Sequence, residues 1–212
     1  MTPSPGQPEE VAIEPPRYDG ALAAWNGKWT DVEESAYFDA IAFIAWYMTP
    51  INETLFAGTT PTTFGPKGTM TRGDFMTVLH KLAGRPEAVG DENFDDIAAD
   101  DYYHDAVLWG CGTGIVAGKG SNRFAPRDAL TRQEMAIILS KYAAYAGLEI
   151  EKLRDLPADL KFDAWADADG HITALAEAGM LTSGGYNLTQ AAPREEIAQM
   201  FEDFVWFILR ER

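Results

Sequence analysis

FAPRDALTRQEMAIIL, residues 124–139, is the stretch that decides the fold of this chain. Its central motif, Thr131-Arg132-Gln133-Glu134, has two relatives in the chain, Thr71-Arg72-Gly73-Asp74 and Pro193-Arg194-Glu195-Glu196. The first lies 60 residues before the central motif and the second 62 residues after it. Because self-similarity at a fixed period is typical of repeat proteins, this spacing predicts three copies of one structural unit.

Three further features recur upstream of each motif. An aromatic residue lies seven positions before it, at Phe64, Phe124 and Tyr186. A Gly-containing turn precedes the aromatic, at residues 55–58, 115–118 and 179–181. An aromatic-led start opens the unit, at residues 29–32, 94–97 and 162–165. Since both the start and the motif lead into apolar residues at helical spacing, each unit is predicted to be helix, loop, helix.

One helix pair cannot bury its apolar stripe alone, so the three units are expected to share a single all-α core. The predicted repeats span residues 29–86, 93–148 and 160–212. The five prolines before Arg17 make residues 1–28 an expected extended linker, and no basic segment followed by an apolar one marks a secretory signal there. The apolar content of 46% is sufficient for a buried core.

Composition excludes several functions. With 33 acidic and 17 basic residues the formal charge is -16, so the long-range field repels nucleic acid and anionic membranes. No apolar stretch reaches the roughly 18 residues that a membrane helix needs, and no membrane insertion is expected. The single cysteine, Cys111, rules out an intrachain disulfide and is predicted to lie in the core. No cofactor motif or metal-ligand spacing occurs.

The repeated motifs resemble the S-layer homology family, whose repeats run from an F-x-D-V-like start through a G-I-V-x-G turn to F-x-P and T-R-A-E. The second repeat, Phe94 to Leu139, carries nearly the whole pattern, and the resemblance covers about residues 29–208. It implies a pseudo-threefold, three-pronged helical bundle whose inter-repeat grooves bind pyruvylated secondary cell-wall polysaccharide. It also implies an extracellular, non-catalytic anchor at the bacterial cell surface. The family's first-helix aromatic corresponds to Tyr102.

Two repeats depart from the family pattern. The first carries an insertion of about six residues at 48–53, relative to the second repeat. The third has Pro193 in place of the motif threonine and Tyr186-Asn187-Leu188 in place of the aromatic-x-proline segment. Its groove is therefore expected to be weakened.

The motif itself suggests a binding chemistry. The threonine and the acidic residue three positions later form a capping box, which is common in soluble helices and needs no ligand. An arginine in the first turn opposes the helix dipole by about 0.3–1 kcal/mol, so its threefold recurrence favours a role in binding. Guanidinium beside first-turn N–H groups can hold the carboxylate of a pyruvyl ketal. The predicted ligand-binding residues are Arg72, Arg132, Arg194, Thr71, Thr131, Asp74, Glu134, Glu196, Gly118 and Lys119.

Other constellations are weaker. Residues 167–172 resemble part of a calcium loop but are expected instead to begin a helix, because the first ligand position would be Trp165. Trp46, Trp109 and Trp206 are predicted to be core residues, and Trp25 and Trp29 surface aromatics. The alternative function is a self-associating protein-interaction scaffold that has lost sugar binding. A carbohydrate-active enzyme would need paired carboxylates across a cleft, and the sequence shows no such pair.

Overall fold

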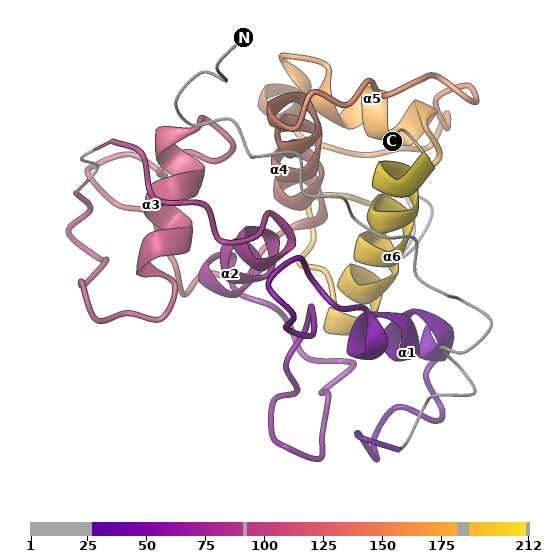
Figure 1. Ribbon diagram of the computed structural model, residues 1–212. Helices are drawn as coiled ribbons and strands as arrows, with labels where there is room; N and C mark the ends of the chain where they lie inside the picture. Colours follow the sequence, from indigo (N-terminus) through magenta and orange to yellow (C-terminus); the bar gives the residue numbers. More distant parts are fainter. Residues whose placement is uncertain (1–26, 91–92, 182–186, 211–212) are drawn as a thin grey trace, which may run out of the picture.

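The computed structural model describes residues 27–90, 93–181 and 187–210. Within these ranges the regular elements are α1 (Phe38–Trp46), α2 (Arg72–Leu82), α3 (His104–Gly112), α4 (Arg132–Tyr145), the 3-10 helix η2 (Ala164–Asp167), α5 (His171–Glu177) and α6 (Arg194–Arg210). The predicted all-α class is therefore confirmed (Figure 1). The expected linker at residues 1–28 lies almost wholly outside the described residues, as do Trp25 and Tyr186.

Helices pack across repeat boundaries rather than within a repeat. The motif helix α2 packs on α3, the first helix of the second repeat, and α4 packs on α5 of the third. The last helix, α6, packs on α1 of the first repeat, so the three repeats close into a ring (Figure 1). Each helix pair thus contains one helix from each of two repeats. This arrangement explains why one repeat has no core of its own.

Backbone hydrogen bonds join the repeats at the centre of the ring. The first-turn N–H groups of each motif donate to carbonyls of the loop that precedes the next motif. Gly73 N–H donates to Pro126 at 2.9 Å, Gln133 N–H to Leu188 at 2.8 Å, and Glu195 N–H to Pro66 at 3.1 Å. Leu188 therefore takes the structural place of the two prolines although its side chain differs.

Aromatic side chains from different repeats form the core. Phe201 of α6 lies 5.2 Å from Phe75 and 5.3 Å from Phe56, measured between ring centroids. Trp29, at the start of the first repeat, is only 1% exposed and lies 4.9 Å from the Phe64 ring. The prediction of Trp29 as a surface aromatic is wrong, because the aromatic of a repeat start packs on the aromatic of the same repeat's second loop.

Other core predictions vary in outcome. Trp109 is fully buried as expected, whereas Trp46 and Trp206 are half-buried. Cys111 is half-buried and packs against the edge of the core. The side chain of Trp109 also lies against His80, with ring centroids 5.1 Å apart.

The sequence departures have clear structural counterparts. The insertion forms a turn between α1 and Leu55, in which Met48 pairs with Thr54 and Asn52 adopts a positive φ of 60°. In the second repeat the Asp96 carboxylate accepts the Phe124 and Ala125 N–H groups, each at 2.9 Å. Ala164 stands at the equivalent place in the third repeat and cannot form this tie.

Candidate functional site

The capping boxes of the first two motifs form as predicted. Thr71 Oγ1 accepts the Asp74 N–H at 3.1 Å, and the Asp74 carboxylate accepts the Thr71 N–H at 3.1 Å. Thr131 and Glu134 make the same pair of bonds at 3.3 and 3.0 Å. In the third motif Pro193 has neither a hydroxyl nor an N–H, so α6 begins without this box.

The motif arginine of the first repeat is buried against the second repeat. Arg72 is 4% exposed, and its guanidinium lies 4.7 Å from the centroid of the Phe124 ring. It donates to the carbonyls of Phe124 at 3.2 Å and Ala117 at 3.0 Å, and to the Glu134 carboxylate at 3.3 Å. Arg72 therefore joins two repeats through its planar fork of donors.

The third motif repeats this arrangement against the first repeat. Arg194 donates to the carbonyls of Phe64 at 2.9 Å and Ala57 at 2.8 Å, and it lies 4.7 Å from the Phe64 ring centroid. Burial lowers the pKa of Arg194, partly offset by Asp74 and Asp31, but the guanidinium stays charged.

The second motif makes a related contact with the third repeat. Arg132 donates through Nε to the Glu196 carboxylate at 2.7 Å and through Nη1 to the Ala191 carbonyl at 3.1 Å. Its Nη2 also pairs with Glu196. Each motif arginine thus joins its own repeat to another one, and we call such an arginine a clasp. Arg72 and Arg194 do so through corresponding carbonyls, whereas Arg132 uses the Ala191 carbonyl and Glu196.

This geometry changes the expected anion chemistry of the motif. The first-turn N–H groups, which the sequence suggests are open to a carboxylate, already donate to the neighbouring repeat. The guanidinium groups are likewise engaged by carbonyl and carboxylate oxygens of this chain. The physical reason is ring closure, which needs a donor set wherever one repeat meets the next. Direct contact of these arginines with a sugar stays a prediction.

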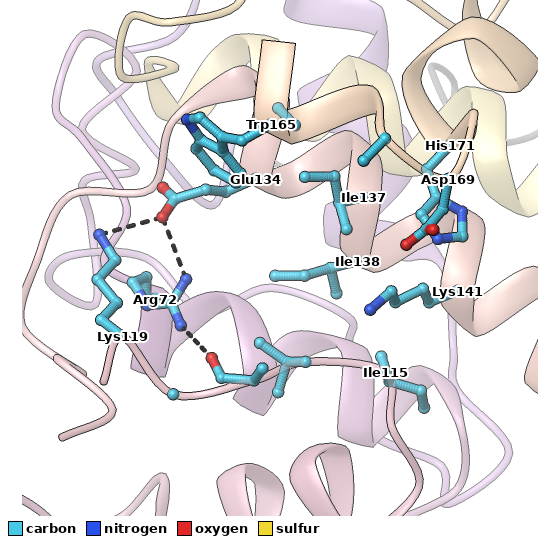
Figure 2. Close-up of a pocket in the computed structure, with 15 residues that line it drawn as sticks. Arg72, Ile115, Lys119, Glu134, Ile137, Ile138, Lys141, Trp165, Asp169 and His171 are labelled. Atoms are coloured by element: carbon cyan, nitrogen blue, oxygen red, sulfur yellow. Dashed lines mark hydrogen bonds and ion pairs between the residues drawn. The ribbon is translucent and has the colours of Figure 1, made fainter. Parts of the chain in front are cut away.

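One groove collects several of the predicted residues. A cavity of about 560 Å³, named here the α4 groove, lies between α4, the second-repeat turn at residues 115–119 and the start of the third repeat (Figure 2). Ile115, Ile137 and Ile138 line its apolar part. Arg72, Gly118, Lys119 and Glu134 lie on it, and Thr131 caps the same helix. The predicted residues Arg132, Arg194, Thr71, Asp74 and Glu196 do not line it.

The charged end of the α4 groove is a small network. Lys119 Nζ lies 3.1 Å from Glu134 and 3.5 Å from Asp128. Burial would raise the pKa of Glu134, but hydrogen bonds from Thr131 and Lys119 and the charge of Arg72 lower it overall. Glu134 is therefore ionised at neutral pH and can accept hydrogen bonds from hydroxyl groups.

Trp165 is the residue that sequence reasoning missed. It lies on η2, lines the α4 groove beside Glu134 and is 62% exposed (Figure 2). An exposed tryptophan over a groove offers a flat apolar face to a ligand. The available signal was its position in a repeat start, where the second repeat has the half-buried aliphatic residue Ile97.

Tyr102 occupies a related position beside α2. It is 68% exposed, and its hydroxyl donates to Asp74, the acidic residue of the first motif. The first-helix aromatic expected from the family pattern is thus placed next to a motif carboxylate, as Trp165 is next to Glu134. This similarity makes Tyr102 a natural comparison for Trp165.

Residues 167–172, which resemble part of a calcium loop, lead into the start of α5 as expected. The Asp167 carboxylate accepts the N–H groups of Ile172 at 2.7 Å and Thr173 at 3.0 Å. No group of three or more His, Cys, Asp or Glu side chains able to hold a metal ion occurs among the described residues. No helix within the same ranges is long and apolar enough to cross a membrane.

A buried carboxylate on α6 predicts a pH effect on stability. Glu202 is 7% exposed, and burial together with the charge of Asp203 raises its pKa. A raised pKa in the folded state means that stability is greatest below the unfolded pKa and is lost as pH rises through the folded one. We expect Glu202→Gln to increase the free energy of unfolding at pH 7 but not at pH 4. Urea titrations at both values measure this, with exposed Glu151→Gln as the control; equal effects at both pH values would contradict it.

The fold and the groove define a class: a closed ring of three helical repeats with a groove that is lined by aliphatic and charged residues and one exposed tryptophan. The S-layer homology domain model matches residues 52–76 and 93–136, in the first and second repeats. The surface-layer 125 kDa protein of Lysinibacillus sphaericus is 41% identical over 76 residues, 36% of this chain and 6% of that protein. Exoglucanase XynX of Acetivibrio thermocellus is 32% identical over 114 residues, 51% of this chain and 10% of that protein.

A third relative, an amylopullulanase of Thermoanaerobacterium thermosulfurigenes, is 26% identical over 161 residues, covering 76% of this chain and 8% of that protein. The chain thus spans a tenth or less of the length of these relatives. Its resemblance to the S-layer homology family is confirmed over the matched segments of the first and second repeats.

Proposed function

We propose that this module anchors its protein by binding an anionic, pyruvylated secondary cell-wall polysaccharide in the α4 groove. The observation that carries the proposal is the exposed Trp165 beside the ionised Glu134 and Lys119. A sugar has apolar C–H faces and polar edges. An aromatic face next to a hydrogen-bond acceptor and a hydrogen-bond donor therefore suits it. The module itself performs no reaction in this proposal.

The charge distribution supports an acidic polymer bound at few points. The chain carries a formal charge of -16, so it has no general affinity for polyanions. Arg72, Lys119 and Lys141 nevertheless line one groove, where these three cations face two lining carboxylates, Glu134 and Asp169, and leave a small positive field. Thr131 caps the start of α4 beside this groove, and Gly118 lies in the turn that lines it.

Titration calorimetry tests the proposal directly. Purified pyruvylated wall polysaccharide is titrated into the wild-type protein and into Trp165→Ala, with Tyr102→Ala as the matched aromatic control. We expect saturable binding by the wild type, weakened at least about tenfold by Trp165→Ala because the sugar loses its stacking face. Tyr102→Ala should bind like the wild type.

Two outcomes would contradict the proposal in different ways. A larger loss in Tyr102→Ala than in Trp165→Ala would move the site to the neighbouring helix α2. No binding of any wall polymer by the folded wild type, together with self-association in sedimentation experiments, would favour the interaction scaffold.

A further inference from the structure

The three motif helices carry different residues at one equivalent position. Nine residues after the motif arginines stand Lys81 on α2, Lys141 on α4 and Asp203 on α6. Because nine residues are two and a half helical turns, each side chain lies well above the motif on its helix. The repeats are alike at the motif but differ here, so this position can distinguish one groove from another.

Lys81 already has a hydrogen-bond partner within the chain. Its Nζ donates to the Thr54 carbonyl at 3.1 Å, directly after the insertion of the first repeat. Burial lowers its pKa, although Glu53 nearby acts in the opposite direction. The insertion therefore uses this cation for internal structure and leaves it poorly placed for a ligand.

Asp203 has the opposite charge. It lies next to buried Glu202 on α6, and the amide of Gln199 bridges both carboxylates at 3.1 Å. An acidic ligand placed against this helix would meet two carboxyl groups. This surface therefore disfavours an anion.

Lys141 differs from the other groove cations in its lack of an ion-pair partner among the described residues. It lines the α4 groove, and Figure 2 shows its amino group directed toward the groove from the end opposite Lys119. Among the residues that the structure describes, no carboxylate or carbonyl pairs with Lys141. Arg72 and Lys119, the other cations of the groove, both pair with Glu134.

The groups that face Lys141 leave its charge available. Asp169, just before α5, and His171, the first residue of α5, lie at the same end of the groove (Figure 2). Burial, and then the charge of Lys141, lower the pKa of His171, so its ring is neutral at pH 7. Ser140 on α4 is hydrogen-bonded to His171 at 3.0 Å, and Asp169 is the carboxylate that lines this end of the groove with Lys141.

We propose that Lys141 recognises the acidic substituent of the wall sugar while Trp165 contacts its ring, and that the motif arginines act as clasps between repeats. This inference rests on the proposed function. The ligand chemistry is a carboxylate carried by a sugar, as in a pyruvyl ketal or a uronic acid. An amino group that pairs with none of the described side chains or carbonyls loses less on binding such a carboxylate than a guanidinium whose donors are already in use.

The test compares two polymers and three variants. Pyruvylated polysaccharide and the same polymer after removal of its pyruvyl groups are titrated into the wild type, Lys141→Met, Lys141→Arg and Lys28→Met. Lys28 is exposed and lies outside the groove, so Lys28→Met makes the same charge change elsewhere. We expect the wild type to prefer the pyruvylated polymer about tenfold, Lys141→Met to bind both polymers alike, and Lys141→Arg to keep part of the preference.

Failure of the inference differs from failure of the proposed function. If Lys141→Met keeps the full preference for the pyruvylated polymer, or if the wild type binds both polymers equally and Lys141→Met binds them as tightly as the wild type does, Lys141 does not recognise a carboxylate and the inference is wrong. A uronic acid as the recognised group would show as Lys141-dependent binding of both polymers that carboxyl reduction abolishes. If the wild type binds neither polymer, the proposed function fails and this inference fails with it.

Discussion

Replacing Arg72 with methionine lowers the free energy of unfolding by about 3 kcal/mol, because a buried clasp between two repeats is lost. The variant leaves the carbonyls of Phe124 and Ala117 without their donor in a site that is 4% exposed. It also removes one of the two cations that pair with Glu134. Urea denaturation followed by far-ultraviolet circular dichroism measures the change.

Arg127→Met is the matched control. Arg127 lies on the same loop as Phe124 but is exposed, so its replacement should change stability by less than about 0.5 kcal/mol. Equal, small effects of the two substitutions would show that Arg72 is dispensable for the ring. Unchanged stability with reduced polysaccharide affinity in Arg72→Met would instead return the motif arginine to the role of a ligand contact.

Phe201→Ala is expected to cost about 3–5 kcal/mol of unfolding free energy, because it leaves a large cavity where the chain closes on itself. Phe201 is fully buried in α6, and its ring meets Phe75 and Phe56 of the first repeat. The loss should therefore affect the first and third repeats together. One cooperative transition at lower denaturant is the expected result.

Phe162→Ala provides the comparison, since Phe162 is only half-buried at the edge of the same core. It should cost clearly less than Phe201→Ala. Two separate transitions in Phe201→Ala, one retaining the wild-type midpoint, would mean that part of the ring folds independently of α6.

Much of the local structure follows from the sequence because it depends on neighbours along the chain. Thr131 and Glu134 form their capping box from atoms three residues apart, so four letters are enough to predict it. The helical spacing of the apolar residues likewise predicts α2 and α4. The burial of Trp29 does not follow from its neighbours along the chain, because its partner, Phe64, lies in another segment.

The sequence by itself determined the number of repeats, the helical class and the helix starts, since these depend on periodicity and short-range hydrogen bonds. Tertiary structure alone decided that Arg72 faces inward as a clasp, that Trp165 stands exposed and that Lys141 lines the α4 groove. The physical reason is that ring closure pairs each helix with a different repeat. The environment of a side chain therefore depends on residues some 50 to 140 positions away, as in the contact of Arg72 with Phe124 or of Arg194 with Ala57.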